Sequence, residues 1–149
     1  MFTSEQEKFM RLALDEAQKA PSTGDVPVGA VVVKDGKAVS VGHNRREAER
    51  NVLLHAEIVA INDACKALKG WRLDDCDIYV TLEPCPMCAG AIINSRIKRV
   101  YFGAFDIKNG AFGGVCDMSV MFTHRPEIHQ GLLESDCAAI LSDFFEKLR

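Results

Sequence analysis

The segment "DIYVTLEPCPMC" (residues 77–88) decides the framework of the chain, because a run of strand-forming residues leads directly into two closely spaced thiols. Its first six residues are rich in apolar and β-branched side chains, which is typical of a buried strand. Proline is tolerated in the first turn of a helix, so Pro84 favours a helix over residues 84–95. The segment therefore predicts a strand–helix unit of an α/β protein, with Cys85 and Cys88 at the start of the helix.

Further elements can be placed on both sides of this unit by their periodicity and their turn residues. They are expected in this order: a helix over residues 4–20 capped by Thr3 or Ser4, strands over 26–33 and 38–43, a helix over 55–68, a strand over 99–103, and a last helix capped by Ser135. Asp35-Gly36 is typical of a tight hairpin turn between the first two strands. Residues 104–118 are rich in glycine and predict a long loop, and such loops are usually functional. A hairpin followed by alternating helices and strands predicts an α/β sandwich with a mixed sheet.

Composition places the chain among globular proteins with one domain. It has 149 residues, of which 48% are hydrophobic and 26% charged, and this excludes a disordered chain. The apolar runs fall short of the ~18 residues that a membrane span needs. The first residues, "MFTSEQEKFMRLALDE" (1–16), are charged and lack the apolar middle of a signal peptide, so we expect a cytoplasmic protein.

Charge and cysteine content narrow the classes of function. The net charge of -3 is not typical of a nucleic-acid-binding domain, although a local basic patch such as "NRREAER" (44–50) is compatible with it. Six cysteines in a chain without a secretion signal more often bind metal or do chemistry than form disulfides. The four cysteines outside the pair are expected to be buried apolar thiols, namely Cys65, Cys76, Cys116 and Cys137.

Cys85, Cys88 and His55 together predict a metal site. The two cysteines are three residues apart at a helix start, which puts both sulfurs on one side, and the helix dipole favours thiolates there. His55 opens the preceding helix, and both helices follow strands, so their starts can meet at one edge of the sheet. Three protein ligands leave a fourth position for water, which is the pattern of a catalytic zinc.

Glu57 adds a possible acid and base to this site, because a carboxylate beside zinc can take and pass on a proton. Two other interpretations remain open from the residues alone. The cysteine pair could belong to a structural zinc site completed by Cys116 or His124, or to a redox pair of the thioredoxin kind. The redox interpretation leaves no role for His55 or Glu57.

Two short motifs carry a resemblance to a known family. "HAE" (55–57) and "PCPMC" (84–88) match the His-x-Glu and Pro-Cys-x-x-Cys signature of zinc nucleobase deaminases. The chain resembles the cytidine deaminase-like superfamily and, within it, the bacterial tRNA-specific adenosine deaminases. The closer resemblance covers nearly the whole chain through "DVPVGAVVV" (25–33), "GHN" (42–44), "HAEIVAI" (55–61), "YVTLEPCPMCAGAI" (79–92), "SRIKRVYFGAFDIKNGA" (95–111) and "DCAAILSDFF" (136–145).

This resemblance implies a fold, a reaction and a cofactor. The fold is a three-layer α/β/α sandwich with a central mixed five-stranded sheet, formed by a single CMP/dCMP-type deaminase domain over residues 1–149. The reaction converts adenosine to inosine at the wobble position of a tRNA anticodon, with zinc-bound hydroxide attacking C6 of the base, and the enzyme is a homodimer. One zinc per subunit is held by His55, Cys85 and Cys88, and Glu57 shuttles protons.

Contacts with the substrate are also implied by the resemblance. They are Asn44 to the target nucleoside, the backbone of Ala56 to the base, Val28 packing against the base, Asp106 to the neighbouring nucleotides, and Phe144 and Phe145 near the splayed-out loop. Asn44 and Asp106 could equally be ordinary turn residues. Phe144 and Phe145 are adjacent and point to different faces of a helix, so one of them is expected in the core.

The sequence departs from that family at two places. Val52-Leu53-Leu54 stands where Asp-Pro-Thr usually precedes the histidine, and Thr123-His124 stands where Asn-His is usual. These departures affect nucleotide selection and leave the metal chemistry unchanged. A deaminase of a free base or nucleoside, such as guanine or cytosine, is the alternative enzyme with the same zinc machinery. A binding module with a structural zinc is the alternative without catalysis.

Overall fold

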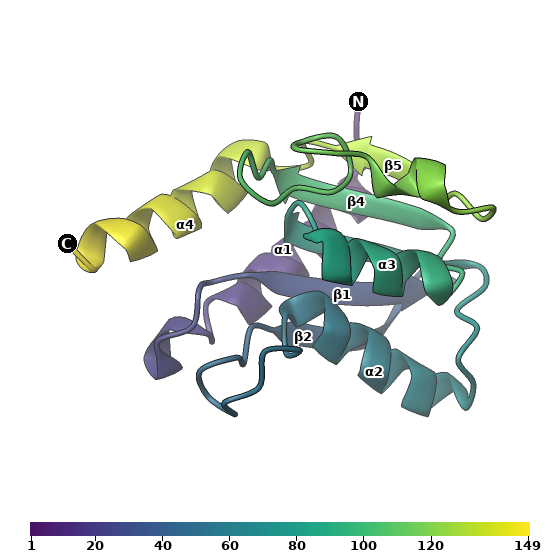
Figure 1. The fold of residues 1–149 in the computed structure, drawn as a ribbon, viewed down its shortest axis with the longest axis horizontal. Helices are drawn as coiled ribbons and strands as arrows, with labels where there is room; N and C mark the ends of the chain where they lie inside the picture. The colour runs from purple at the N-terminus through teal and green to yellow at the C-terminus, as the bar shows by residue number, and fades with distance from the viewer.

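One mixed sheet of five strands forms the centre of the molecule in the computed structural model, which describes residues 1–149 (Figure 1). The strands span Gly29–Lys34 (β1), Lys37–His43 (β2), Cys76–Leu82 (β3), Arg99–Ala104 (β4) and Glu127–Gln130 (β5). Their order across the sheet is β2-β1-β3-β4-β5. β1 is antiparallel to β2 and β3, whereas β4 is parallel to both of its neighbours.

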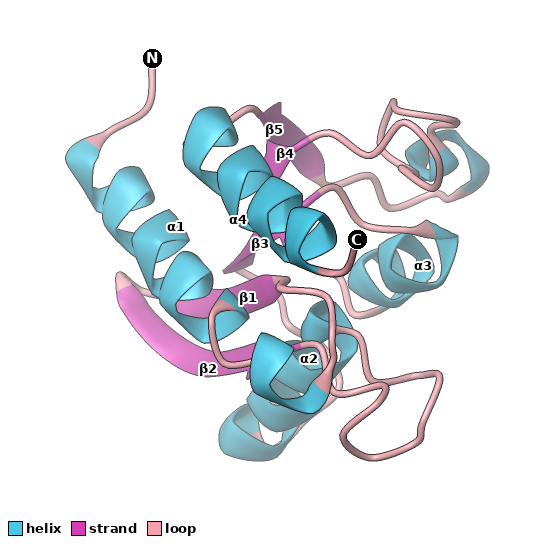
Figure 2. Cartoon of the chain, turned by 90° about the vertical axis from the view of Figure 1, so that its left-hand side faces the viewer, coloured by secondary structure: helices cyan, strands magenta, loops and turns pink.

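Helices cover both faces of this sheet, as Figure 2 shows. α1 (Ser4–Ala17) and α4 (Glu134–Lys147) lie on one face, and α2 (Ala56–Leu68) and α3 (Pro86–Asn94) lie on the other. Two short 3-10 helices, Pro21–Thr23 and Met118–Met121, lie in the connections. The predicted three-layer α/β/α sandwich with a mixed five-stranded sheet is therefore confirmed. None of the helices is both long and apolar enough to cross a membrane.

The buried side chains form one cluster on each face of the sheet. Along β1, Ala30 and Val32 join the cluster beneath α2 and α3, whereas Val31 and Val33 join the cluster beneath α1. Successive side chains of a strand point to opposite faces, so a strand covered on both sides must be apolar throughout. This double burial explains the unbroken apolar run of residues 30–33.

Two glycines illustrate how the local sequence shapes the sheet and its contacts. Asp35 and Gly36 both have positive φ, 51° and 73°, which is the turn that fits the twist of a two-residue hairpin. Gly42, near the end of β2, allows α2 to lie directly on the strand. A Cβ atom at Gly42 would be 2.6 Å from the carbonyl oxygen of Ala56, at the start of α2.

Several boundaries differ from the sequence-based expectations in the first half of the chain. Thr3 caps α1 in a reciprocal capping box with Gln6, but the helix ends at Ala17 and not at residue 20, because a 3-10 turn follows. β1 begins at Gly29 and not at residue 26. The preceding backbone makes a tight turn, in which the N–H of Val28 donates to the carbonyl of Val26 at 2.9 Å.

The later helices also begin at residues other than those expected. Pro84 does not open α3, because its carbonyl accepts the N–H of Ala111; Pro86 occupies the first position of the helix, where its fixed φ fits best. α4 begins directly after Leu133, which has the left-handed conformation, so Ser135 lies inside the first turn and does not cap the helix. The sequence alone had not located β5.

Candidate active site

The starts of α2 and α3 bring together three side chains that could hold a metal ion. His55 and Cys85 are the N-cap residues of these two helices, and both have extended backbone conformations. Neither side chain caps its own helix, so both are free to turn toward the gap between the helix starts. Nδ1 of His55 lies 3.6 Å from Sγ of Cys85 and 3.4 Å from Sγ of Cys88.

This donor set fits a tetrahedral metal ion. The three atoms lie within 4.8 Å of one another. Zinc bonds of about 2.3 Å to sulfur and about 2.0–2.1 Å to nitrogen, at a tetrahedral angle, separate the two donors by about 3.6 Å. The group includes neither Cys116, which is exposed, nor His124, whose Nε2 lies 2.9 Å from the carbonyl of Ile97. The structure therefore offers three ligands and no fourth protein ligand.

A hydrogen bond between the two thiols moves their pKa values in opposite directions. A hydrogen bond from the Cys88 thiol lowers the pKa of Cys85 to about 4, although burial opposes this, and the neighbouring His55 lowers the pKa further. The proton left on Cys88 is hard to remove, so the pKa of that thiol is raised. The hydrogen bond to Cys85 likewise raises the pKa of His55. A thiolate, which is the form that binds metal, is thus already favoured at Cys85.

Glu57 is a buried carboxyl group in the first turn of α2, and its side chain lines the same cavity as His55 and Cys85. Burial raises its pKa to about 7. A carboxyl group with such a pKa can both accept and release a proton near neutral pH, which is the property that a general acid and base requires.

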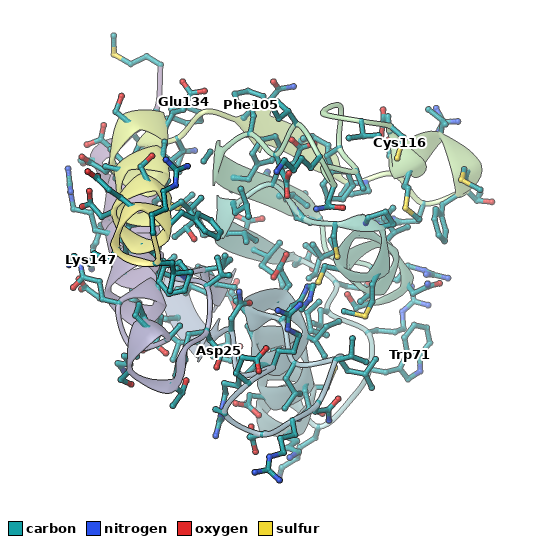
Figure 3. All side chains as sticks on the ribbon, turned by 60° about the vertical axis from the view of Figure 1, so that its left-hand side comes forward. Asp25, Trp71, Phe105, Cys116, Glu134 and Lys147 are labelled. Carbon is teal, nitrogen blue, oxygen red and sulfur yellow. The ribbon has the colours of Figure 1, made fainter.

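A cavity of about 660 Å³ opens above His55, Glu57 and Cys85. One wall comes from the loops around β1 and β2, with Asp25, Val28, Asn44 and Arg46. The opposite wall comes from residues 105–109, which follow β4, together with Leu141 and Phe145 of α4. Asp25 and Phe105 mark the two walls in Figure 3. The volume of the cavity lies within the range of about 300–1,000 Å³ that is usual for small-molecule sites.

Asn44 links the segment before β1 to the start of α2, and both segments contain residues that were expected to contact the substrate. Its Oδ1 accepts the N–H of Ala56 at 2.9 Å, and its Nδ2 donates to the carbonyl of Val26 at 2.9 Å. Asn44 thus satisfies the first free N–H of α2, which His55 leaves without a cap. Asn44 and Val28 both line the cavity, while the N–H of Ala56 is already bonded to Asn44. Their contacts with a substrate stay predictions.

The remaining predicted contacts lie on the opposite wall or beside it. Asp106 lines the cavity, and its Oδ1 also accepts the N–H groups of Lys108 and Asn109 at 2.9 and 3.0 Å, so it stabilises a turn of the loop. Phe145 is 45% exposed and lines the cavity. Phe144 does not line it and packs edge-on against Phe145, with ring centroids 5.3 Å apart. The expectation that one of the two rings lies in the core is wrong, because Phe144 is half-buried and belongs to neither core cluster. The contacts of both rings with a substrate stay predictions.

Asp25 is a site residue that the sequence analysis did not find. Its buried carboxylate accepts the N–H groups of Glu47 and Ala48 at 2.7 and 3.1 Å and the hydroxyl of Thr23 at 2.8 Å. Burial acts to raise the pKa of Asp25, but these hydrogen bonds outweigh it and the pKa is lowered. Two of the three partners are backbone groups more than 20 residues away, and such partners leave no signal in the sequence.

The charged segment 44–50 is partly neutralised by its own side chains. Arg45 pairs with Glu49 at 2.9 Å and Arg46 with Glu47 at 3.6 Å. Arg46 nevertheless lines the cavity, so it also provides positive charge at the site. The segment is therefore a solvated loop that contributes one arginine to the wall of the cavity.

The four cysteines outside the site differ in burial. Cys76 and Cys137 are buried and Cys65 is partly buried, as expected for apolar thiols. The expectation for Cys116 is wrong, because this residue is exposed on the loop that follows β4 (Figure 3). The carbonyl of Cys116 accepts the N–H of Gly113, so the turn of the loop carries the side chain outward.

Comparison with known proteins agrees with this geometry. A tRNA-specific adenosine deaminase of Bacillus subtilis (strain 168) is 47% identical over 148 residues, which are 98% of this chain and 92% of that protein. A solved structure from a study of A-to-I editing by tRNA:A34 deaminases superposes with a TM-score of 0.86 at 48% identity, covering 90% of this chain and 99% of that one. A guanine deaminase from Bacillus subtilis superposes with a TM-score of 0.65 at 38% identity, covering 77% and 73% of the two chains.

The three-layer fold, the His-Cys-Cys group at two helix starts and the buried Glu57 together define a deaminase of the cytidine deaminase-like class. The family of MafB19-like deaminases matches residues 4–149. The chain belongs to this family.

Proposed function

We propose that this protein is a zinc-dependent hydrolytic deaminase that converts adenosine to inosine at the wobble position of a tRNA anticodon. The observation that carries the proposal is one cavity that unites His55, Cys85 and Glu57 with two walls built from separate loops. The 47% identity to a tRNA-specific adenosine deaminase over nearly the whole length of both chains supports this substrate. The whole of residues 1–149 serves as the one deaminase domain.

His55, Cys85 and Cys88 hold one zinc ion per chain in this proposal. Zinc, when bound there, supplies a Lewis acid that lowers the pKa of water toward about 7. The carboxylate of Glu57 takes a proton from the attacking water. The same carboxyl oxygen then passes the proton to the amino nitrogen at C6, which leaves as ammonia, so that water and adenosine give inosine. A pKa of about 7 at Glu57 suits both halves of this transfer.

An RNA loop suits the shape and charge of the site. In a single-stranded loop the bases are already unpaired, so the enzyme avoids most of the few kcal/mol that extrusion from a duplex costs. The cavity is open, and its walls extend beyond the zinc ligands to Asp25 and Arg46 on one side and Lys108 on the other. The nucleotides beside the target can therefore contact these walls.

Binding of an anticodon stem-loop at increasing salt concentration tests the RNA part of this proposal. We expect the affinity to fall as salt rises, because each phosphate contact releases counterions. Arg46→Ala and Lys108→Ala should each reduce the slope of log affinity against log salt by about one unit. Lys66→Ala, at the far end of α2, serves as the matched control. Binding that does not change with salt would contradict an RNA substrate.

A free-base deaminase is the second candidate, and the 38% identity to a guanine deaminase favours it as the alternative. Both enzymes use the same ligands, so the metal site does not separate them. The 47% identity to the tRNA-specific adenosine deaminase over 98% of this chain, against 38% to the guanine deaminase over 77% of it, favours the RNA substrate. A guanine deaminase would act on the free base without a need for Arg46 or Lys108.

We further propose that the protein is cytoplasmic, since its proposed substrate is tRNA, and that it is a homodimer. α3 presents small residues, and a Cβ atom at Gly90 would meet nothing within 4 Å. Val120 and Met121 are exposed at 59% and 76% in the 3-10 helix that packs beside α3. Exposed apolar side chains of this kind are usual at protein interfaces. Light scattering at micromolar concentration should give the mass of two chains, and the mass of one chain would contradict the dimer.

A further inference from the structure

Glu83 is a buried carboxylate with a set of partners that the reaction does not explain. It lies between the end of β3 and Cys85 and is 2% exposed. Its Oε1 accepts the N–H of Asp106 at 3.1 Å, and its Oε2 accepts the N–H groups of Phe112 and Gly114 at 3.1 and 2.8 Å. All three donors are backbone groups of the loop that follows β4.

This loop is wrapped tightly around the carboxylate. A Cβ atom at Gly114 would lie 2.6 Å from Oε1 of Glu83, and a Cβ atom at Gly110 would overlap the carboxylate. Glycines at both positions therefore allow the backbone to approach the charged group. The N–H of Glu83 itself donates to the carbonyl of Ala104, and the carbonyl of Pro84 accepts the N–H of Ala111, each at 2.9 Å.

The loop held by Glu83 forms a wall of the cavity. Residues 105–109 line that wall, and the three donors to Glu83 lie within or just after this stretch. Two residues after Glu83, the chain reaches Cys85 in the metal-binding group. One carboxylate thus joins the segment that carries a metal ligand to the segment that faces the substrate.

We propose that Glu83 is a positioning residue that holds residues 105–114 as a preformed wall for the nucleotides beside the target adenosine. The inference rests on the proposed RNA substrate. A loop that is ordered before binding does not have to be ordered by the RNA, so the entropy cost of binding is smaller. Glu83 also lines the cavity, but its side-chain hydrogen bonds all go to the loop and none goes to His55, Cys85 or Cys88. Its effect should therefore appear in RNA affinity more than in the rate of the chemical step.

Glu83→Gln tests this role because it keeps the volume of the side chain but replaces one acceptor oxygen with an N–H₂ donor. At least one loop N–H then faces a donor. We expect faster amide hydrogen exchange confined to residues 105–114, with one zinc per chain retained. The dissociation constant of a wobble-adenosine stem-loop should rise roughly tenfold, because a buried donor is left unsatisfied. The single-turnover rate at saturating RNA should change by less than about threefold.

Glu16→Gln is the matched control, since Glu16 is also a buried carboxylate but pairs with Lys19 and His43, away from the cavity. It should leave exchange in residues 105–114 and RNA affinity unchanged. If Glu83→Gln does not fold, Gly110→Ala provides a second variant, because its Cβ would overlap the carboxylate and so separates the loop from Glu83 without removing the acceptor oxygens. The same rise in dissociation constant is expected for this variant.

Three results would overturn the proposal: unchanged exchange in residues 105–114, an unchanged dissociation constant, or a saturated rate that falls as far as the affinity. Loss of zinc from Glu83→Gln would also overturn it, because Glu83 would then act through the metal ligands. If the unmutated protein neither binds nor deaminates a stem-loop, the proposed function fails. Hydrogen exchange in that case still decides whether Glu83 orders the loop.

Discussion

Glu57 and Asp25 are both buried carboxyl groups at the cavity, yet their surroundings move their pKa values in opposite directions. Burial dominates at Glu57 and raises its pKa to about 7. At Asp25, burial is outweighed by hydrogen bonds from two backbone N–H groups and a hydroxyl, and the pKa is lowered. Glu57 can therefore carry a proton through the reaction, whereas Asp25 stays ionised and holds a loop.

Replacement of Glu57, the proposed catalytic carboxyl group, should separate chemistry from metal binding. We expect Glu57→Ala to retain one zinc per chain and the native fold, since Glu57 is not among the three metal ligands. Deamination should fall by about 10²–10⁴-fold, the usual contribution of general acid–base catalysis. The upper end is expected because one residue handles several proton transfers. Turnover close to that of the unmutated protein would remove Glu57 from the mechanism.

Loss of a ligand should instead abolish stoichiometric metal binding. Cys85→Ala leaves only two donors for zinc, and two ligands do not form a stable tetrahedral site. Metal analysis of the purified variant should show well below one zinc per chain. Cys116→Ala is the matched control, because Cys116 is an exposed thiol outside the metal-binding group and should leave the zinc content unchanged. Full zinc content in Cys85→Ala would show that the ligand set is wrong.

Asp25 should make stability depend on pH in the acid range. Its pKa is lower in the folded protein than its usual value of 3.8, so its contribution is fully present above that value. The contribution is lost as pH falls through the folded-state pKa. Asp25→Asn should lower the free energy of unfolding by about 1–3 kcal/mol at pH 7. Urea unfolding at a series of pH values should show this difference shrinking below about pH 4. A difference that stays constant would contradict the assignment.

At the scale of elements, the site consists of two helix starts brought together at one edge of a sheet. Each helix contributes its N-cap residue as a candidate metal ligand, His55 from α2 and Cys85 from α3. The position of α2 depends on its close packing against β2. Gly42 permits this approach near the start of α2, because it has no Cβ atom.

Gly42→Ala should therefore disturb the metal site from a distance. The new Cβ would lie 2.6 Å from the carbonyl oxygen of Ala56 and 2.8 Å from the nitrogen of Ala60, so α2 must shift. Overpacking of this kind typically costs about 1–3 kcal/mol of stability. Zinc affinity, measured by competition with a chelator, should fall as His55 moves. Gly70→Ala is the control, because a Cβ there meets nothing within 4 Å. Unchanged affinity in Gly42→Ala would contradict this coupling.

Elements with strong periodicity could be predicted from the sequence, and those fixed by distant contacts could not. The apolar runs of β1 and β3 and the caps of α1 are local signals, and they gave the correct elements with small errors at the ends. β5 has four residues, two of them exposed, and so carries no clear alternation. It is held by parallel pairing with β4 and by His129, which stacks on Tyr101 with ring centroids 4.7 Å apart.

The same distinction applies to the site. Four residues of the candidate site could be predicted because they form two pairs that are close in the chain, each at a helix start. These pairs are His55 with Glu57 and Cys85 with Cys88. Asp25 and Glu83 could not be predicted, because their partners are backbone N–H groups of segments more than 20 residues away, which any residue except proline can supply.

At the scale of the whole molecule, the sandwich serves to hold loops from both halves of the chain around one cavity. The loop after β2, the turn after β3, the loop after β4 and the side of α4 all reach it. Trp71, by contrast, lies at the edge of the molecule away from Asp25 and Phe105 (Figure 3). Because the walls are loops and the floor is formed by helix starts, substrate choice can change without a change in the metal chemistry.

The most direct test of this account is a deamination assay with purified zinc-loaded protein on two kinds of substrate. One is an anticodon stem-loop with adenosine at the wobble position, and the other is a panel of free guanine, cytosine, adenosine and cytidine. The account predicts inosine at the wobble position and little turnover of the free compounds. Rapid turnover of guanine or cytosine, with no inosine formed in the stem-loop, would contradict it.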